Sequence, residues 1–574
     1  MSQDFKKQFV LDDRLACTNE INYAVSQGGQ NITTADFNAV SQGTSSHTYS
    51  IQVPSEQTII DRRVMWTSTV VLKLVGTPGI NEFLVDVGRS DALAPFPLHQ
   101  LCSTISATIN NNTVSTNIRD VLSAIVRMND KRDLQRYNGL TPVMFDTYKS
   151  YADGVNANNN PLGSYSNIAD NDLIPRGAHP ILIGGALLAS GLPDTTVLQT
   201  VGDGATLKTV YIAFTVSEPL LLSPFIFCNP QSNNQGFYGI QNMNIQMNIS
   251  DAIRVWRTAR NFLTVGANAG VSVQSFQGSK LTFQFLTPHS NLLLPSRNVV
   301  PYYELPRYLS SPGVAFAANE TKSIQSNTIA LNQIPDKLFI IVRKPMSAQL
   351  NQDTDSFFKI NTVSINFNNS SGILSSSNIQ DLYRFSVESG SNQSWYEFSG
   401  QALRSNAITG NGASVNTTGS LLVLEFGRHI QLTESFYAPG SLGNFSLQVN
   451  VNCTNNSGGA ITPEICLITM NSGCFISERG TSQTYTALLS KADVLEAGKM
   501  EPYKRSDVRR LVGGGWFDDL KSAWNKYISP HLTASNLKKG LQHVGKDNEY
   551  AQKGADVLGA LGYGKSGGLQ NRLM

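Results

Sequence analysis

The side chains that most often carry out enzymatic chemistry are scattered along this chain. Its seven histidines show no metal-site spacing: His47, His99, His179, His289, His429, His531 and His543. A His-Glu-x-x-His motif is absent. A carboxylate pair for glycoside hydrolysis can assemble only in the folded chain, so the sequence leaves that chemistry open. We predict no catalytic residue, no metal site and no cofactor, and we interpret His99 as structural.

The six cysteines are also spread widely, and none forms a Cys-x-x-Cys pair. They lie mostly in apolar or strand-like contexts, which favours reduced, buried thiols over a disulfide framework. The first residues, MSQDFKKQFVLDDR, lack the apolar segment of a signal peptide. Both features predict a protein that is made inside a cell and is not secreted.

Charge is unusually sparse in these 574 residues. Only 15% of them are charged, against about 25% in ordinary soluble proteins. Asn, Gln, Ser, Thr and Gly fill the deficit, which suits long loops and surfaces that neighbours will cover, where an unpaired charge would be costly. The net charge of +2 argues against a body that coats nucleic acid, and we expect no sequence-specific nucleic-acid partner.

Strand patterns dominate both halves of the sequence. Runs that alternate or are rich in β-branched and aromatic residues lie at 67–75, 209–216, 241–249, 280–286, 338–342, 363–367, 421–426, 445–451 and 465–470. Helical patterns are few, at 118–136, at 379–387 and in the tail. The proline-rich segment 287–308 is interpreted as an extended connector between two strand-rich blocks. This organisation predicts sandwiches or jelly rolls.

One local pattern occurs twice. A strand-like run meets Asn110-Asn111-Asn112 and is followed by an Asn117-Ile118-x-Asp helix start. The same order recurs at Asn368-Asn369 and Asn378-Ile379-x-Asp. The two Asn clusters lie 258 positions apart and the two helix starts 261 apart, which favours a duplication of a large β-rich unit. Chance remains the alternative, because Asn and Ser are abundant.

Several ordered strings resemble the major capsid proteins of the adintovirus, Polinton and virophage group. They are FPLHQLCSTISATINNNTVSTNIRDVL (96–122), VPYYELPRY (300–308), IPDKLFIIVRKP (334–345) and the stretch from INFNN to EFSG (365–400). The resemblance implies an all-β protein of two tandem jelly-roll barrels (a double jelly roll), with long loops, few short helices and a C-terminal amphipathic helical tail. It also implies a structural protein of the virion rather than an enzyme.

The resemblance further implies how such a chain assembles. Three copies would form a homotrimer of pseudo-hexagonal outline, a hexon-like capsomer, that tiles an icosahedral DNA-virus shell. The implied partners are neighbouring capsomers, single jelly-roll penton or minor capsid proteins, and a maturation protease. A minor capsid protein and a two-domain β-sandwich protein that binds or acts on carbohydrate are the alternative interpretations.

A candidate cleavage site follows the last predicted strand. Leu511-Val512-Gly513-Gly514-Gly515 fits the pattern cut by adenovirus-type cysteine proteases, in which two glycines let an extended chain lie flat in a narrow cleft. The alternative is a flexible glycine linker. The pattern predicts a maturation cut between Gly514 and Gly515.

The tail beyond the glycines is amphipathic. Its apolar stripe consists of Trp516, Phe517, Leu520, Trp524, Tyr527 and Ile528, and polar residues take the other side. Aromatic residues with later lysines suit an interfacial helix at a membrane surface. A helix that packs beneath a shell or on a partner is an equal alternative.

These patterns divide the chain into five segments. We predict an N-terminal arm at 1–50, a first jelly roll at 51–288 and a second jelly roll at 289–498. A linker with the candidate protease site follows at 499–514. The amphipathic, Gly-rich tail takes 515–574 and is lost if the site is cut.

Overall fold

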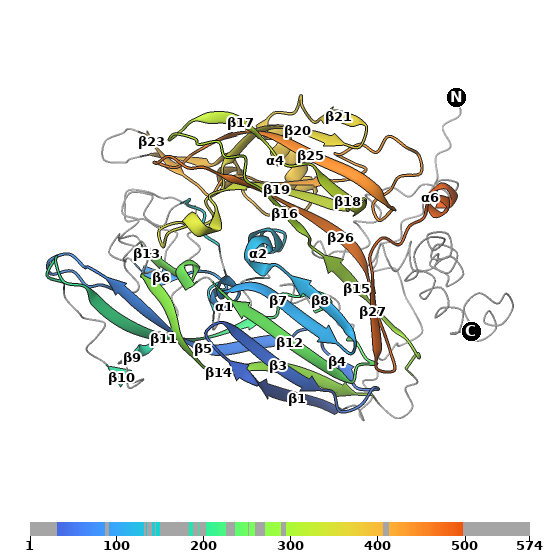
Figure 1. The fold of residues 1–574 in the computed structure, drawn as a ribbon, viewed down its shortest axis with the longest axis horizontal. Coiled ribbons are helices and arrows are strands. Elements are labelled where there is room, and N and C mark those ends of the chain that lie inside the picture. Colours follow the sequence, from blue (N-terminus) through green and yellow to red (C-terminus); the bar gives the residue numbers. More distant parts are fainter. Residues whose placement is uncertain are drawn as a thin grey trace, which may run out of the picture.

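The computed structural model describes residues 31–85, 91–130, 134, 141–143, 145–149, 183–187, 193–194, 202–225, 236–250, 252–258, 270–288, 294–405 and 412–497. Two β-rich barrels lie one above the other in Figure 1, with helix α2 (Ile118–Arg127) between them. The candidate cleavage site and the amphipathic tail lie outside the described residues.

The first barrel is built from two facing sheets. One has the order β1-β14-β5-β11-β9-β10, with β4 paired to β14, and the other has the order β2-β3-β12-β7-β8. Their bounds are β1 Asn31–Asn38, β2 Ser41–Gln42, β3 Ser46–Gln52, β4 Ile59–Ile60, β5 Met65–Gly76, β7 Cys102–Ile109, β8 Asn112–Thr116, β9 Ile183–Leu187, β10 Pro193–Asp194, β11 Lys208–Pro219, β12 Asn242–Ile249 and β14 Val271–Thr287. A small pair, β6 (Asp91–Leu93) and β13 (Trp256–Thr258), lies apart from both sheets.

The second barrel repeats this strand order. Its sheets run β15-β26-β19-β24, with β16 and β27 also on β26, and β17-β25-β20-β21, with β18 on β25. The bounds are β15 Asn298–Glu304, β16 Arg307–Ser310, β17 Thr321–Gln325, β18 Ile329–Gln333, β19 Lys337–Arg343, β20 Lys359–Phe367, β21 Ser370–Ile373, β24 Leu421–Glu425, β25 Leu442–Thr454, β26 Glu464–Glu478 and β27 Thr481–Tyr485. A hairpin of β22 (Gln401–Ser405) and β23 (Gly412–Asn416) lies beside them. Each barrel is therefore a jelly roll.

The described helices are short. They are α1 (Pro97–Leu101), α2, α4 (Ile379–Glu388), α5 (Trp395–Ser399) and α6 (Lys491–Ala497), with 3-10 turns η4 (Ala252–Arg254) and η5 (Met346–Ala348). In both barrels a hairpin leads directly into a helix, β7–β8 into α2 and β20–β21 into α4. The expected duplication is therefore present in the fold, while α2 ends at Arg127 instead of continuing to residue 136.

Alternation of apolar and polar residues along the strands explains why the barrel sheets have one buried face and one exposed face. In β12, Met243, Ile245 and Met247 point into the first core, whereas Asn242, Asn244 and Gln246 are exposed. This two-residue period is what a half-buried strand requires. The outward side is polar but uncharged, in keeping with the low charge of the sequence.

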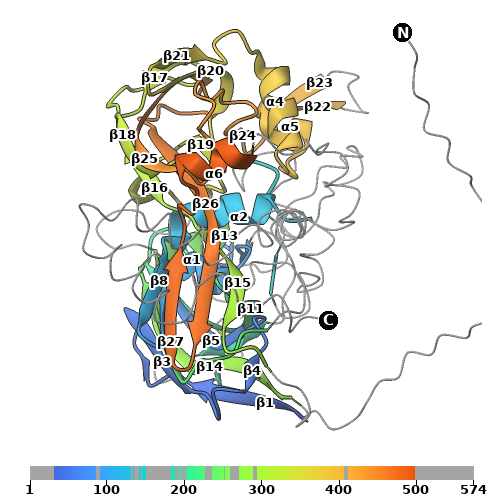
Figure 2. The same cartoon turned by 90° about the vertical axis from the view of Figure 1, so that its right-hand side faces the viewer.

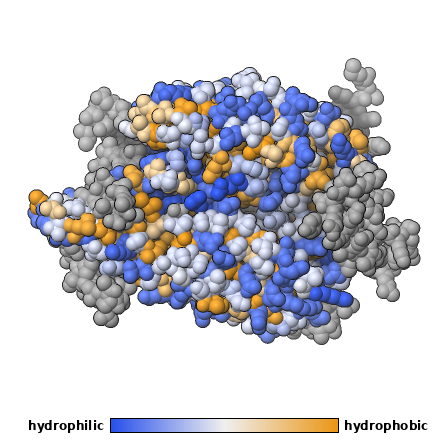
Figure 3. Space-filling model, in the orientation of Figure 1, coloured by the Kyte–Doolittle hydropathy of each residue, from blue (hydrophilic) through white to orange (hydrophobic). Residues whose placement is uncertain are grey.

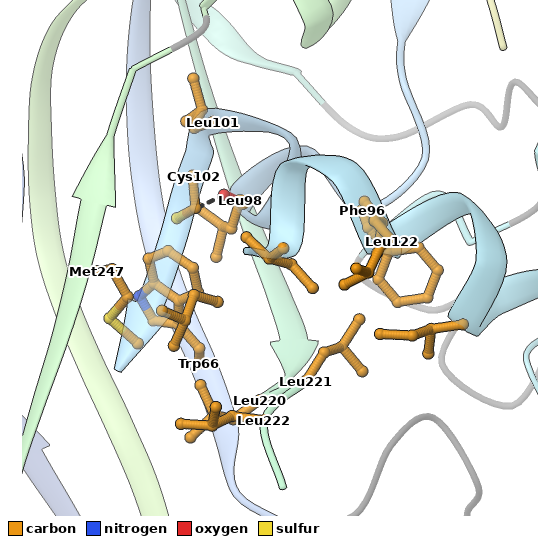
Figure 4. Packing of buried hydrophobic residues seen from close by; sticks show 14 of the residues in the cluster. Trp66, Phe96, Leu98, Leu101, Cys102, Leu122, Leu220, Leu221, Leu222 and Met247 are labelled. Atoms are coloured by element: carbon orange, nitrogen blue, oxygen red, sulfur yellow. Dashed lines mark hydrogen bonds between the residues drawn. The ribbon is translucent and has the colours of Figure 1, made fainter. Parts of the chain in front are cut away.

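Figure 4 shows the first core around Trp66, which is fully buried near Cys102 and Met247. His99 is part of this region. Its Nδ1 lies 2.5 Å from the Glu218 carboxylate, and its Nε2 accepts a hydrogen bond from the Leu221 N–H at 3.2 Å. Both ring nitrogens are thus used internally, which agrees with a structural role. The four described cysteines, Cys102, Cys453, Cys466 and Cys474, are buried and free.

The nine predicted strand runs are confirmed, and two other expectations need correction. The prediction of an extended connector over residues 287–308 is wrong, because β14 continues to Thr287 and β15 begins at Asn298. Pro301 is accommodated in β15 because that strand lies at a sheet edge, where a missing N–H costs no ladder bond. Residues 31–50, expected within an arm, form β1, β2 and part of β3, and β1 pairs with β14 along its whole length.

Candidate functional site at the junction of the two barrels

The junction of the two barrels is where their relative position is fixed. Helix α2 lies there, and nine of its ten residues are buried, all except Arg119. Opposite the helix, β19 and β24 are buried along their whole length. Phe339 and Ile341 of β19 belong to the first core, while Leu338 and Ile340 belong to the second. The sheet of the second barrel therefore contributes one face to each core.

A buried ionic network joins the start of α2 to the second barrel. Asp120 Oδ1 accepts a hydrogen bond from Arg343 Nη2 of β19 at 2.5 Å, and Arg343 Nε donates to Glu464 Oε1 of β26 at 2.8 Å. Arg307 Nε of β16 lies 2.6 Å from Asp120 Oδ2 as an ion pair without hydrogen-bond alignment. Arg119 Nε lies 3.8 Å from Asp120 Oδ1. Asp120 is 2% exposed, so this carboxylate depends on the guanidinium groups around it.

A second polar contact fixes the end of α2. Arg127 Nη1 donates to Asp355 Oδ2 at 2.5 Å, and the Ser123 hydroxyl donates to Asp355 Oδ1 at 2.9 Å. The Arg127 guanidinium also lies 5.2 Å from the ring centres of Phe145 and Phe357. Burial alone would raise the pKa of Asp355, but the charge and hydrogen bonds of Arg127 and Ser123 outweigh it, and the pKa lies below its ordinary value.

Backbone contacts add to these ionic ones. Lys149 Nζ donates to the Phe357 carbonyl at 3.0 Å, and the Thr354 hydroxyl donates to the Tyr148 carbonyl at 2.5 Å. Asn351 Nδ2 donates to the carbonyls of Ile253 and Trp256 at 3.0 and 3.1 Å. The loop between β19 and β20 is thus bonded to two segments of the first half of the chain.

The long β26–β27 hairpin extends from the second barrel along the first, as Figure 2 shows. Ser482 Oγ donates to the Ile109 carbonyl at 2.5 Å, and Ser477 Oγ donates to the Tyr238 carbonyl at 2.5 Å. The Phe475 ring packs edge-on against Phe237, with centroids 6.4 Å apart. This hairpin covers part of the first core with residues from the end of the second barrel.

The described part of the junction is held by packing, hydrogen bonds and ion pairs between the two barrels. Within the described ranges, no group of three or more His, Cys, Asp and Glu side chains could hold a metal ion. Among the same residues, no helix is long and apolar enough to cross a membrane. Burial raises the pKa of the Cys453, Cys466 and Cys474 thiols to about 12, which keeps them protonated.

The candidate site residues from the sequence, Leu511 to Gly515 and Trp516 to Ile528, fall outside the described residues. Sequence reasoning also missed the junction. Asp120, Ser123 and Arg127 are spaced as one helix face, which is ordinarily taken as a solvated face. The unbroken apolar run LFIIV within β19 was the available signal, because a strand without alternation is buried on both faces.

Comparisons with known proteins agree with this architecture. A family model described as the first domain of the Sputnik virophage major capsid protein matches residues 3–286. A second model, described as the C-terminal domain of major capsid protein V20, matches residues 305–473. The putative capsid protein V20 of Sputnik virophage is 28% identical over 581 aligned residues, which cover 97% of this chain and 93% of that protein.

Solved structures show the same likeness. A chain from the cryo-EM structure of the Sputnik virophage superposes with a TM-score of 0.74 at 27% identity, covering 89% of this chain and 99% of that one. The crystal structure of the mavirus major capsid protein gives a TM-score of 0.66 at 14% identity, covering 88% and 100%, and so supports the fold.

Two barrels that share the order of the four central strands in each sheet, joined by a buried junction, define a double jelly-roll capsid protein. The sequence matches identify which double jelly-roll capsid proteins this chain is related to. The chain belongs with the virophage major capsid proteins, and it is a structural component of the virion. This result favours a major capsid protein over both alternatives, a minor capsid protein and a carbohydrate-directed β-sandwich.

Proposed function

We propose that the chain assembles as a homotrimeric, pseudo-hexagonal capsomer that tiles an icosahedral shell. The observation that carries this proposal is the rigid pairing of two barrels with the same strand order, since three such pairs provide six similar edges. Light scattering of the full chain tests it. A trimer at micromolar concentration is expected, and a monomer under all solution conditions would contradict it.

The proposed units are those predicted from the sequence: an arm, a first jelly roll, a second jelly roll, a linker and a tail. The first jelly roll is extended back to β1 at the expense of the arm. The junction contacts support testing the two barrels together rather than as separate domains. Neighbouring capsomers and single jelly-roll penton or minor capsid proteins are the proposed partners of their outer edges.

A maturation protease of the adenovirus type is proposed to cut between Gly514 and Gly515. The support is the Leu511-Val512-Gly513-Gly514-Gly515 string just beyond the strand-rich body. Intact-mass spectrometry of particles should find bodies that end at Gly514. Gly513→Val should block the cut, because a branched side chain prevents close backbone approach. Particles that retain Met574 in most copies would contradict the proposal.

The released tail is proposed to bind a membrane surface through Trp516, Phe517 and Trp524. A peptide of residues 515–539 should become helical on lipid vesicles, with a blue shift of Trp fluorescence. The variant with Trp516→Ser and Trp524→Ser should lose binding, whereas Asp518→Asn should retain it. A peptide that stays unstructured on vesicles would favour an internal scaffold instead.

No catalytic role is proposed for this chain. Two strings in the tail match enzyme motifs letter for letter: GALGYGKS (559–566) has P-loop spacing, and GKSGG (564–568) has the Gly-x-Ser-x-Gly spacing. A functional P-loop needs a buried strand before it and a helix after it. The preceding AQKGADVL and the following GGLQNRLM resemble neither. Purified chain should therefore not hydrolyse ATP, which a phosphate-release assay measures.

A further inference from the structure

Helix α4 has polar side chains at the positions that form the junction face of α2, with the acidic residue shared and the other two positions different in charge. The repeat of 261 positions relates Asp120, Ser123 and Arg127 to Asp381, Arg384 and Glu388. In α2 these side chains are buried against the second barrel, whereas the side chains of Asp381, Arg384 and Glu388 are 33%, 62% and 35% exposed. Arg384 pairs with its own helix, 3.3 Å from Asp381 and 3.9 Å from Glu388.

The first barrel offers a sheet face that matches the other side of the junction. The strand corresponding to β19 is β5, since each lies third in its sheet order, beside β26 or β14. Arg343 of β19 is paired with Glu464 at the start of β26, and Lys73 of β5 is paired with Ser272 near the start of β14. Lys73 is partly exposed and alternates with the buried Leu72 and Leu74, so it points outward.

We infer that the exposed face of α4 docks on the outer face of β5 in a second copy of this chain, with Asp381 opposite Lys73. This contact would repeat between copies what α2 and β19 do within one chain. It rests on the proposed trimer and assigns the surfaces that form it. The contact is head-to-tail, because α4 and β5 are different surfaces, and such a contact closes into a ring when its rotation permits.

The composition of the two faces suits copies that first fold separately. The outer face of β19 is apolar, with Phe339 and Ile341. The outer face of β5 carries Thr67 and Thr69, which bond to Ser217 and Thr215, and Val71 on this face is already buried in the single chain. An interface between independently soluble partners is more polar than a permanent core.

Exposed apolar side chains accompany both faces. Val387 (45%) and Tyr396 (52%) are on α4 and α5, and Ile80 (72%) and Leu207 (57%) flank the ends of β5 and β11. Figure 3 shows hydrophobic surface at the protruding tip on the left of the molecule, where β5 and β11 end in Figure 1. These side chains are available to pack when the two faces meet.

Cysteine cross-linking of the full chain tests the contact. The double variant with Lys73→Cys and Asp381→Cys should form covalent trimers under mild oxidation, seen on non-reducing gels. Lys73→Cys alone should remain monomeric on the gel, and a mixture of the two single variants should give a covalent dimer. The described native cysteines are buried, and the unaltered chain under the same oxidation measures any background.

Charge exchange gives an independent readout. Asp381→Lys and Lys73→Glu should each weaken trimerisation about tenfold or more, because like charges then face each other, and the double variant should recover it. Glu434→Lys makes the same charge change on an exposed loop and should have no effect. The contact would be overturned, and the proposed trimer retained, if the chain trimerises but the cysteine variants do not cross-link and both charge reversals leave trimerisation unchanged. No trimer from the unaltered chain would overturn the proposed function itself.

Discussion

The two hairpin–helix units of the barrels share a turn but differ in how their helices are used. Asn110 and Asn368 both have left-handed backbones, with φ of 52° and 50°. Asn110 donates its N–H to the Asn242 carbonyl and accepts from the Gln241 N–H through Oδ1, each at 2.9 Å. Asn368 makes both bonds at the same distance with Ser446. The two barrels therefore share this turn chemistry, and Asn110 Nδ2 in addition donates to the Gly239 carbonyl at 3.2 Å.

The acidic residue of each helix start has diverged. Asp381 forms a capping box with Asn378 and is partly exposed. Asp120 makes no such box and instead enters the ionic network with Arg343 and Arg307. The same residue at the same place thus caps a helix in one barrel and joins the two barrels in the other. Redirecting this one side chain adds an ionic contact to the interface between the barrels.

The largest expected effect comes from this acidic residue. Asp120→Asn should lower the free energy of unfolding by about 3 kcal/mol, because Arg343 then keeps only Glu464 and Arg307 loses its ion pair with Asp120. Asp381→Asn should cost less than about 1 kcal/mol, as expected for a partly exposed cap. Chemical denaturation of both variants measures the difference, and equal losses would refute the division of roles.

The histidines provide a pH-dependent contrast. Burial lowers the pKa of His47 to about 4, so between pH 6.5 and 4 the folded chain binds fewer protons than the unfolded chain. Stability should therefore fall as the pH decreases through this window. His47→Gln should remove about 2 kcal/mol of the loss between pH 6.5 and 4.5.

His429→Gln in the second barrel serves as the matched comparison. The pKa of His429 is also lowered, first by burial and then by Arg428, while Glu425 and Glu388 oppose the shift. Its substitution should change the pH dependence less than that of His47. Denaturation series at several pH values measure both contributions. A larger effect at His429 would contradict the prediction that His47 contributes more to the pH dependence of stability.

The shared turn predicts similar losses in the two barrels, with a somewhat larger loss at Asn110, whose side chain also donates to the Gly239 carbonyl. Asn110→Ala and Asn368→Ala should each cost about 2 kcal/mol, roughly half from the left-handed backbone and half from the lost hydrogen bond. Asn110→Gly and Asn368→Gly retain the backbone freedom and should cost about 1 kcal/mol each. Strongly unequal losses between the barrels, measured by thermal unfolding, would break the equivalence of the turns.

The smallest effect concerns the helix caps. The Asn378 side chain accepts from the Gln380 and Asp381 N–H groups, so Asn378→Ala should cost about 1 kcal/mol. Asn117 begins α2 without a side-chain cap bond, and Asn117→Ala should be close to neutral. The same unfolding assay separates them, and a greater loss at Asn117 would contradict the structure.

Local pattern allowed much of the fold to be predicted. Alternation identified strands such as β12, and the Asn-rich turns revealed the duplication, because both signals depend on residues close in sequence. The junction depends on pairs such as Asp120 and Arg343, separated by 223 residues, which no local period reports. Pro301 misled the prediction because a proline is tolerated in an edge strand, and edge position is a property of the whole sheet.

The β26–β27 hairpin has a consequence for synthesis of the chain. Ile468, Met470 and Phe475 belong to the first core, although they are made long after its other strands. On a ribosome, the N-terminal barrel must therefore wait, with part of its apolar interior uncovered, until the hairpin has left the exit tunnel.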